Sequence, residues 1–369
     1  MKVFFIINSL SSGGAERVTV TLANYFVDKG YEVGLVTMHT EERDFYPLDS
    51  RVVRFPLGLG GSNWGYRKLY ATYRRWKVLR HVLRNEQPDV VVAMMTTSII
   101  LAIVASLKLN IRVFGSERNF PGDKPISLPW ALLRRITYRF AHGHIAQTYE
   151  TANWLRNNTG ADNLDVIPNP VAWPIAKFNP EIKPNNILKP GRKVILAVGS
   201  KPDQKGFDLL VLAFSGLASD WPEWDLVILG VDPESEAICG GGASVKRVVN
   251  EYNISDRVFL PGRAGNVSDW YDRADIFVLS SRYEGFPNVL LEAMASGNAS
   301  VAVDCNTGPR DIIQDGVNGL LVPLDSLQAG MVRLIADDTL RIKLGEKATY
   351  VKKDFSEKRV AELWLEILR

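Results

Sequence analysis

The sequence predicts an α/β protein made of two doubly wound parallel sheets. Short apolar segments alternate with amphipathic segments, and this alternation restarts near residue 193 after a proline-rich stretch. Such alternation indicates parallel strands that helices cover on both faces. The length of 369 residues also fits two domains of ordinary size. We therefore expect a ligand cleft between the carboxyl ends of the two sets of strands.

Each series of elements begins with a strongly apolar strand. The expected strands of the first series are Val3–Ile7, Glu32–Thr37, Asp89–Met94, Asn110–Gly115 and His144–Thr148. Those of the second series are Lys193–Gly199, Asp225–Gly230, Arg257–Leu260, Ile276–Ser280 and Ser300–Val303. A helical pattern runs from Ala15 to Lys29 and ends at Gly30. The stretch Ile167–Arg192 contains six prolines and is predicted to be a linker.

Composition and cysteine use indicate a soluble protein of the cytoplasm. Hydrophobic residues make up 46% of the chain and charged residues 23%, which is ordinary for a globular protein. The longest apolar stretch, Ser98–Leu107, is too short to cross a bilayer, and Val3–Ile7 is too short for a signal-peptide core. Cys239 and Cys305 supply neither a disulfide framework nor metal-ligand spacing.

The net charge of +3 hides an uneven distribution. Residues 51–140 carry 16 Lys and Arg against 4 Asp and Glu, an excess of 12. This basic, aromatic-rich block predicts contact with an anionic surface or partner. If Tyr66–Asn85 is helical, one face carries Arg67, Lys68, Arg74 and Arg75, and the opposite face carries Leu69, Tyr73, Trp76 and Leu83. The alternative is a solvated helix face.

The most informative motif is the run from Glu284 to Glu292. It follows an apolar strand pattern, and Pro287 and Asn288 suit a helix entry, with Asn288 as the expected N-cap. The free N–H groups of a helix start favour a phosphate, and the two acids can accept hydrogen bonds from hydroxyls on either side of it. A diphosphate with hydroxyl groups on both sides is the chemical arrangement of a nucleotide sugar. The alternative is an ordinary strand–helix unit with two solvated acids.

Three further loops follow predicted strands and carry chemistry. Asn8–Arg17 contains Gly13 and Gly14, which favour close approach of a phosphate, or else form only a tight turn. The loop after Val198 contains Lys205, a candidate diphosphate contact whose alternative is a solvated lysine. The third loop groups an acid, a cation and an amide, for which a structural ion pair is the alternative. Its residues are Glu117, Arg118 and Asn119.

Several common sites are missing from the sequence. There is no D-x-D pair, so a metal bridging a nucleotide diphosphate has no obvious carboxylate seat, and His142 and His144 lack metal-binding partners. A P-loop, a G-x-S-x-G elbow and the kinase motifs are also absent. No nucleic-acid-binding module pattern is visible, although basic and aromatic residues are interleaved. We therefore expect no metal, no cofactor and no nucleic-acid partner.

These motifs together resemble the bacterial family 4 glycosyltransferases of the GT-B fold, over nearly the whole chain. The run from Glu284 to Glu292 matches the E-x7-E motif of that family, and Lys205–Gly206 matches its donor-diphosphate loop. The final helix, Ser356–Leu368, resembles one that crosses back onto the N-terminal domain. The resemblance implies an acceptor domain over 1–170, a donor domain over 171–355 and a returning helix over 356–369. It also implies retaining sugar transfer without a metal.

The resemblance also implies roles for individual residues. Glu284 would contact the donor sugar, Glu292 the ribose and Lys205 the diphosphate, with Glu284 and Lys205 acting in catalysis. The full set expected to contact the donor is Gly13, Gly14, Gly199, Ser200, Lys201, Lys205, Gly262, Arg263, Glu284, Gly285, Phe286, Pro287, Asn288, Val289 and Glu292. The set expected to contact the acceptor is Glu16, Arg17, Arg67, Lys68, Arg74, Arg75, Glu117, Arg118 and Asn119.

Two positions depart from the family pattern. The family usually has an arginine where this chain has Ser200, and Lys201 is a candidate to replace it, although neighbouring side chains can point in opposite directions. Many members have a histidine near the sugar, roughly where Arg118 stands. This difference weakens the case for a general base there, and Arg118 is a candidate for an acceptor phosphate instead.

The expected function is transfer of a sugar from a nucleotide sugar to a lipid-linked saccharide in cell-surface polysaccharide synthesis. UDP is expected from its frequency in the family, and the donor sugar is not identified by the sequence. We expect the protein to act at the inner face of the plasma membrane, where it would associate peripherally with the anionic lipid surface. The alternatives are a sugar-nucleotide epimerase of the same fold and a non-catalytic nucleotide-sugar binding protein.

Overall fold

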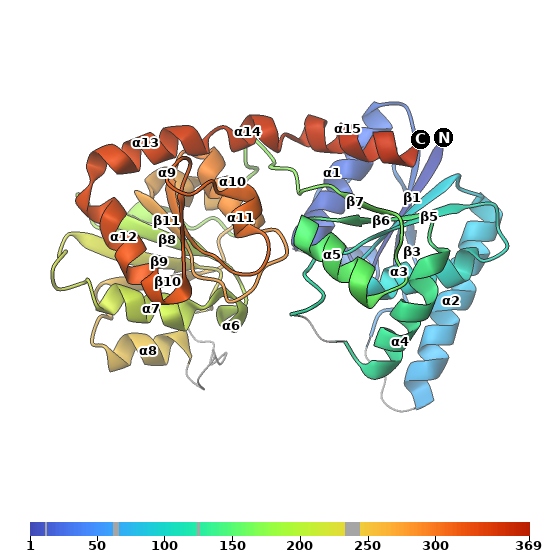
Figure 1. Ribbon diagram of the computed structural model, residues 1–369, viewed down its shortest axis with the longest axis horizontal. Coiled ribbons are helices and arrows are strands. Elements are labelled where there is room, and N and C mark those ends of the chain that lie inside the picture. Colours follow the sequence, from blue (N-terminus) through green and yellow to red (C-terminus); the bar gives the residue numbers. More distant parts are fainter. Residues whose placement is uncertain (12, 62–65, 124–125, 233–243) are drawn as a thin grey trace. The chain divides into compact units, whose positions relative to one another are not determined.

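The chain folds into two compact units. The computed structural model describes residues 1–11, 13–61, 66–123, 126–232 and 244–369, except for the side chains of Arg43, Tyr66, Arg67 and Lys68. One unit consists of Met1–Pro170 together with Glu357–Arg369, and the other is Val171–Ser356 (Figure 1). Cys239 lies outside the described residues.

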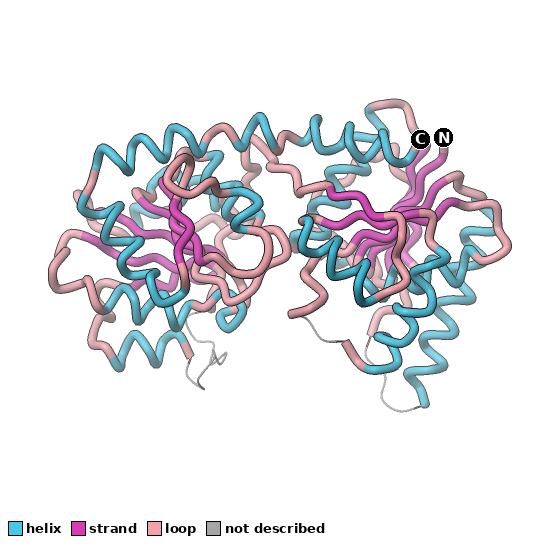
Figure 2. The backbone as a smooth tube through the Cα atoms, viewed as in Figure 1, coloured by secondary structure: helices cyan, strands magenta, loops and turns pink. Residues whose placement is uncertain are grey.

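The first unit is built on a seven-stranded parallel sheet (Figure 2). Both neighbours of β1 are parallel to it, with Val3 opposite Val33 on β2 and Val90 on β4. The strands, in their order across the sheet, are β3 (Val53–Pro56), β2 (Glu32–Thr37), β1 (Lys2–Ile7), β4 (Val90–Met94), β5 (Arg112–Ser116), β6 (Gly143–Ala146) and β7 (Leu164–Val166).

Helices cover both faces of this sheet, which explains the continuous apolar strands. Along β1, Val3, Phe5 and Ile7 face one core, whereas Phe4 and Ile6 face the other. The first core contains side chains of α1 (Gly14–Asp28) and α15 (Glu357–Leu368), and the second contains those of α2 (Tyr66–Glu86), α3 (Thr96–Ser106) and α5 (Tyr149–Asn158). Helix α4 (Leu128–Thr137) packs against α3.

The second unit repeats the design with a six-stranded parallel sheet. Its strands, in their order across the sheet, are β10 (Val258–Gly262), β9 (Trp224–Leu229), β8 (Lys193–Val198), β11 (Ile276–Leu279), β12 (Ala299–Val303) and β13 (Leu320–Val322). The connecting helices are α6 (Pro202–Lys205), α7 (Phe207–Ser215), α8 (Val245–Glu251), α9 (Val267–Arg273), α10 (Asn288–Ala295), α11 (Pro309–Ile312), α12 (Leu327–Ala336), α13 (Asp338–Ala348) and α14 (Val351–Asp354).

The predicted fold class is confirmed, and so is each strand named from the sequence, to within two residues at each end. The sequence missed β3, β7 and β13, which lie at the edges of the two sheets. β3 and β7 contain no buried residue and β13 is only three residues long, so none of the three shows the apolar run that identifies the others. Within the described residues, no helix is both long enough and apolar enough to span a membrane.

The predicted linker is wrong for most of its length. From Val171 onward the chain is part of the second unit, where Val171 and Leu188 are buried in the core. The side chain of Asn266 accepts a hydrogen bond from the backbone N–H of Ile182 and donates one to its carbonyl. The Trp270 indole donates to the same carbonyl at 2.9 Å. Prolines in this segment therefore belong to a packed extended chain, not a flexible tether.

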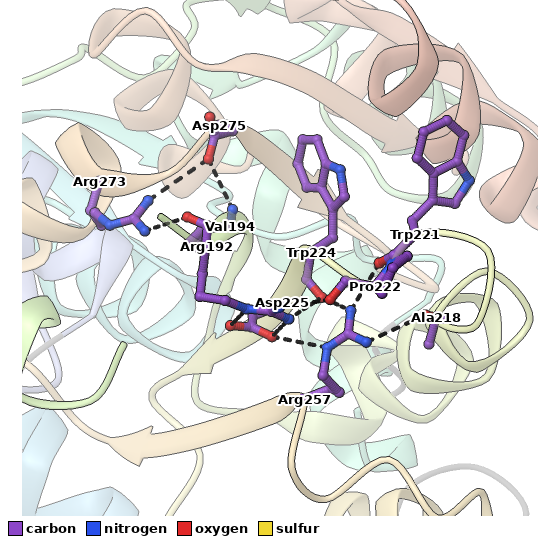
Figure 3. Close-up of polar contacts among 10 residues, drawn as sticks. All are labelled: Arg192, Val194, Ala218, Trp221, Pro222, Trp224, Asp225, Arg257, Arg273 and Asp275. Atoms are coloured by element: carbon purple, nitrogen blue, oxygen red, sulfur yellow. Dashed lines mark hydrogen bonds and ion pairs between the residues drawn. The ribbon is translucent and has the colours of Figure 1, made fainter. Parts of the chain in front are cut away.

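A network of charged side chains connects the amino-terminal ends of neighbouring strands in the second sheet (Figure 3). The Asp225 carboxylate accepts hydrogen bonds from Arg192 at 2.5 Å and from Arg257 at 3.1 Å. Arg257 also donates to the backbone carbonyls of Ala218 and Trp221. Because this edge is filled by its own internal pairs, ligand chemistry is expected at the opposite, carboxyl edge.

Asp225→Ala should destabilise the protein, because it leaves two guanidinium groups beside a buried gap. We expect a loss of about 2–4 kcal/mol, somewhat below the cost of breaking a fully buried pair because both arginines stay partly exposed. The measurement is chemical denaturation of the purified protein. The matched control is Asp28→Ala, whose partner Arg51 is exposed and which should cost less than about 1 kcal/mol. Equal effects from the two substitutions would contradict this account.

Candidate active site

The order of the strands reverses between β8 and β11 in the second unit. These two strands are neighbours, with Ile195 opposite Ile276, although β9 and β10 lie between them in the sequence. Ligands of doubly wound sheets bind outside the carboxyl ends of the strands at such a reversal. The loops that begin there are 199–206, which follows β8 and includes the short helix α6, and 280–287, which follows β11.

Gly206 allows these two loops to pack together. It ends α6 in the left-handed region, with φ of +60°, which favours glycine. A Cβ atom at this position would lie only 2.2 Å from the carbonyl oxygen of Ser280. The Ser280 hydroxyl in turn donates to the carbonyl of Lys205 at 2.7 Å. The backbone around Lys205 is thus fixed against the loop that carries Glu284.

Lys205 and Glu284 form an ion pair across the two loops. The Lys205 Nζ lies 2.6 Å from Glu284 Oε1, and the two side chains are 14% and 7% exposed. The stem of Lys205 crosses Gly199, where a Cβ atom would lie 2.7 Å from Lys205 Cγ. Neither residue is solvated, so the alternatives of a solvated lysine and solvated acids are wrong. The sequence named both residues but did not predict that they pair.

Hydrogen bonds fix both the side chain and the backbone carbonyl of Glu284. The buried Ser281 hydroxyl donates to Glu284 Oε1 at 2.6 Å, and the buried Thr307 hydroxyl donates to the Glu284 carbonyl. Burial, together with the charge of Glu284, raises the pKa of the Cys305 thiol to about 12. Sequence reasoning missed Ser281 and Thr307; the available signal was their place at the carboxyl ends of β11 and β12.

Helix α10 begins next to this pair, one residue earlier than the sequence predicts. Pro287 is the N-cap, in an extended conformation and without a side-chain cap, and Asn288 is the first helical residue. The prediction that Asn288 caps the helix is therefore wrong. The physical reason is that the Pro287 carbonyl accepts from the N–H groups of Leu290 and Leu291, so the helical hydrogen bonds start at proline. Gly285 and Phe286, which precede it, are buried.

Glu292 lies one turn further along α10 and is also buried. The hydroxyl of Tyr271, on α9, donates to Glu292 Oε2 at 3.0 Å and reaches the Val289 carbonyl at 3.3 Å. The two glutamates of the motif thus have different surroundings: one is paired with a cation, and the other accepts from a phenol. Tyr271 was not named from the sequence, because nothing near it in the chain marks it.

Three glycines line the same edge at the ends of β8, β9 and β10. Gly230 has φ of +92°, and a Cβ atom there would lie 2.6 Å from the Gly199 carbonyl oxygen. The Gly230 N–H donates to the Gly262 carbonyl at 2.8 Å. Gly199 and Gly262 were named from the sequence, whereas Gly230 was not. Ser200, Lys201 and Arg263 are exposed beside them, so side chains capable of ligand contact are present at this edge.

In the first unit, Gly13 and Gly14 occupy the turn between β1 and α1. Gly13 is the N-cap of α1, and its carbonyl accepts from the Arg17 N–H at 3.0 Å. A Cβ atom on Gly13 would lie 2.2 Å from Glu16 Oε2, so the Glu16 side chain folds back over the start of its own helix. Ser12, in the same loop, lies outside the described residues.

Glu117 and Arg118, in the loop after β5, do not form an ion pair with each other. Glu117 is buried and accepts from the hydroxyls of Thr96, at 2.8 Å, and Tyr138, at 2.5 Å. Arg118 is 5% exposed and donates to Asn169 and Ser116 instead. Its Nε has no hydrogen-bond partner in the part of the chain that the structure describes, and burial lowers the pKa of its guanidinium to about 9. The amide of Asn119 contacts the Met95 sulfur.

The basic face expected on α2 is only partly present. Arg74 is exposed, but Arg75 donates to the carbonyls of Leu59 and Gly61, and the side chains of Arg67 and Lys68 lie outside the described residues.

The apolar face of α2 differs from expectation as well. Leu83 is buried, whereas Leu69 and Tyr73 are exposed. Arg80, on the same helix, donates to the carbonyls of Ala105 and Leu107 and so caps the end of α3.

No group of three or more potential metal ligands lies together within the described part of the chain. The positive charge beside Glu284 comes from Lys205. A helix start also lies next to the pair and carries a partial positive charge. The site can therefore hold an anion between a lysine and backbone N–H groups.

Two family models match the chain. One, described as Glycosyltransferase Family 4, matches residues 12–172, and the other, described as Glycosyl transferases group 1, matches residues 192–337. The chain belongs to the family 4 glycosyltransferases. The matched residues of the second model include both loops of the ion pair and all of α10.

The similarity to known proteins covers the whole length of this chain. An uncharacterized glycosyltransferase of Haemophilus influenzae is 26% identical, with 99% of each chain covered. A Campylobacter jejuni N-acetylgalactosaminyltransferase, named for an undecaprenol-diphosphate-linked acceptor, is 26% identical over 100% of this chain and 98% of its own.

Solved structures show the same GT-B fold. Sucrose-phosphate synthase of Thermosynechococcus elongatus has a TM-score of 0.83 at 19% identity, covering 100% of this chain and 98% of its own. Anabaena HepE, solved in complex with UDP-glucose, has a TM-score of 0.77 at 18% identity, covering 100% and 99%.

Gly206→Ala should damage the glycosyltransferase more than the same change at Gly191. Both glycines have positive φ, which costs an alanine about 1–2 kcal/mol. Only at Gly206 does the new Cβ also collide with a backbone carbonyl, since nothing lies within 4 Å of one at Gly191. We expect an additional loss of about 1–3 kcal/mol from overpacking at Gly206. Chemical denaturation of both variants measures the difference, and equal losses would show that the loop contact is unimportant.

Proposed function

We propose that this glycosyltransferase moves a sugar from a nucleotide sugar to a lipid-linked saccharide, with retention of configuration and without a metal. The observation that carries the proposal is the Lys205–Glu284 pair beside the start of α10, with Glu292 one turn further on. The solved relative with UDP-glucose supports a UDP-sugar donor. The Campylobacter relative, named for a polyprenol-linked acceptor, supports the acceptor class. Polysaccharide assembly at the inner membrane face is the proposed setting.

The donor is proposed to bind along the carboxyl edge of the second unit. Backbone N–H groups at the start of α10 and the ammonium of Lys205 would hold the diphosphate. Glu292 would accept hydrogen bonds from the ribose hydroxyls, and Glu284 from the sugar hydroxyls. An ammonium has three donors, so Lys205 can keep one hydrogen bond to Glu284 and still donate to a phosphate oxygen.

The chemistry needs little acid–base machinery. The bond between the anomeric carbon and the diphosphate oxygen breaks, and the acceptor hydroxyl forms a new bond to the same carbon from the same face. The departing phosphate oxygen takes the proton of that hydroxyl. Negative charge grows on the diphosphate as it leaves, so a fixed lysine and helix start stabilise this transition state more than the ground state.

The acceptor is proposed to bind the first unit. Arg118 is the strongest candidate contact, because it is a buried cation that, among the described residues, has no carboxylate partner and an Nε without a hydrogen bond. A buried charge of this kind gains from a nearby anion, such as an acceptor phosphate. Glu16, Arg17 and Asn119 remain further candidates at the carboxyl edge of the same sheet.

The proposed function is tested in two steps with the full-length protein. A screen of nucleotide sugars for slow hydrolysis identifies the donor without knowledge of the acceptor. Transfer from that donor to polyprenyl-diphosphate saccharides then tests the acceptor class, and the NMR coupling constant of the product gives its anomeric configuration. Epimerised donor, or binding without turnover, would contradict the proposal.

Glu292→Ala should weaken nucleotide binding roughly ten- to a hundredfold, because charge-assisted hydrogen bonds are worth about 1.5–3 kcal/mol. Isothermal titration of the variant with UDP measures this loss. Glu346→Ala is the matched control, since Glu346 is an exposed acid of the same unit. Unchanged UDP affinity in a folded Glu292 variant would remove this residue from the donor site.

Lys205→Ala should lower turnover more than donor affinity, because its charge matters most as the diphosphate departs. Steady-state hydrolysis of the donor separates the two parameters, with Lys343→Ala as the control at an exposed lysine. The wild-type rate should be unchanged by EDTA, since the proposed stabilisation comes from lysine and backbone N–H groups. Normal turnover in the Lys205 variant, or activity that EDTA removes and metal restores, would oppose the mechanism.

A further inference from the structure

Helix α4 and the turn after it present an apolar stripe to solvent. The α4 stripe consists of Leu128, Leu132, Leu133, Ile136 and Phe140. Leu128, Leu132 and Ile136 follow one another at intervals of four residues, which places them on one side of α4, and Phe140 lies in the 3-10 turn Tyr138–Phe140 that follows the helix. Leu128 is 85% exposed, Leu132 59%, Ile136 45% and Phe140 58%. Single exposed apolar residues are common, but a contiguous group on one element marks an interaction surface.

The opposite side of α4 is firmly attached to the first unit (Figure 1). Arg134 is buried, and its guanidinium lies 4.7 Å from the centre of the Trp154 ring. Thr137 is buried as well, and Tyr138 follows it with its hydroxyl bonded to Glu117. The stripe is therefore the outer face of an anchored helix. Because Arg134 is buried, it is not available to a partner.

The charges on the segment that carries the stripe are of one sign. Arg135 and Arg139 are exposed and alternate with the apolar residues, and residues 126–140 contain no Asp or Glu. An apolar stripe flanked only by cations fits the interface of an anionic bilayer, where side chains insert and arginines meet lipid phosphates. We propose that the α4 stripe inserts into an anionic lipid surface and docks the protein there.

A second copy of the chain fits the stripe less well. A symmetric contact would place the same patch against itself, and so would bring Arg135 and Arg139 of both copies together without acids to compensate them. Like charges set against one another oppose such an interface.

The placement of α4 links this surface to the acceptor side. Tyr138, at the end of α4, donates to Glu117, which directly precedes Arg118 in the loop after β5. Docking through α4 would hold this loop close to the membrane, where the lipid part of an acceptor lies. The inference thus rests on the proposed lipid-linked acceptor for its purpose, but the docking itself is measurable without any substrate.

The test is cosedimentation with phosphatidylcholine vesicles that contain or lack phosphatidylglycerol. Wild-type protein should sediment with the anionic vesicles, and the triple variant Leu132→Gln, Ile136→Gln, Phe140→Gln should bind them at least about tenfold more weakly. The matched control is Val317→Gln, Leu324→Gln, Ile342→Gln, three exposed apolar residues of the second unit, which should bind like wild type. Arg135→Gln with Arg139→Gln should weaken binding to anionic vesicles and reduce its dependence on salt.

Three results would overturn the inference: wild-type protein that stays in solution with every vesicle, a stripe variant that sediments like wild type, or a wild-type dimer that the stripe variant converts to a monomer in analytical ultracentrifugation. Donor hydrolysis should be equal in wild type and both triple variants. Vesicle binding without transfer to any lipid-linked acceptor would refute the proposed acceptor and leave the docking surface intact.

Discussion

The candidate site depends on one interaction, the ion pair between Lys205 and Glu284. Taking both charges out of water is costly, and the pair persists because its geometry is close and Ser281 supplies a further hydrogen bond. The loops that carry the two residues meet because β8 and β11 are neighbours at the reversal of strand order. Gly206 then allows the backbones to approach. Sheet topology, a left-handed glycine and a buried charge pair are thus parts of one constraint.

The two units share a topology but organise charge differently at their carboxyl edges. In the second unit a cation and an acid neutralise one another. In the first unit Glu117 is held by two hydroxyls, and Arg118 is held by an amide and a serine. A buried arginine without a carboxylate partner among the described residues lowers stability, and a bound anion would compensate its charge. This contrast suits a protein whose two units bind different ligands.

Much of this could be predicted from the sequence, and the failures have physical causes. Buried central strands have continuous apolar runs, so the sequence predicts β1, β4, β8 and β11, whereas β7 has no buried residue and β13 is only three residues long, and neither is predicted. Glu284, Lys205 and Glu292 carry recognisable local motifs. Tyr271 supports Glu292 from another helix, and Arg118 turns to Asn169 instead of its neighbour. Such pairings depend on tertiary packing, which local patterns do not contain.

The most direct test of the central pair is a double-mutant cycle of Lys205→Ala and Glu284→Ala. The measured quantity is kcat/KM for hydrolysis of the nucleotide sugar that the wild-type protein accepts. The account predicts that the two losses are strongly non-additive, with a coupling energy of about 1–3 kcal/mol, because each residue holds the other in position for its own contact with the donor. Independent, additive losses would contradict it, and so would a wild-type protein that hydrolyses no nucleotide sugar.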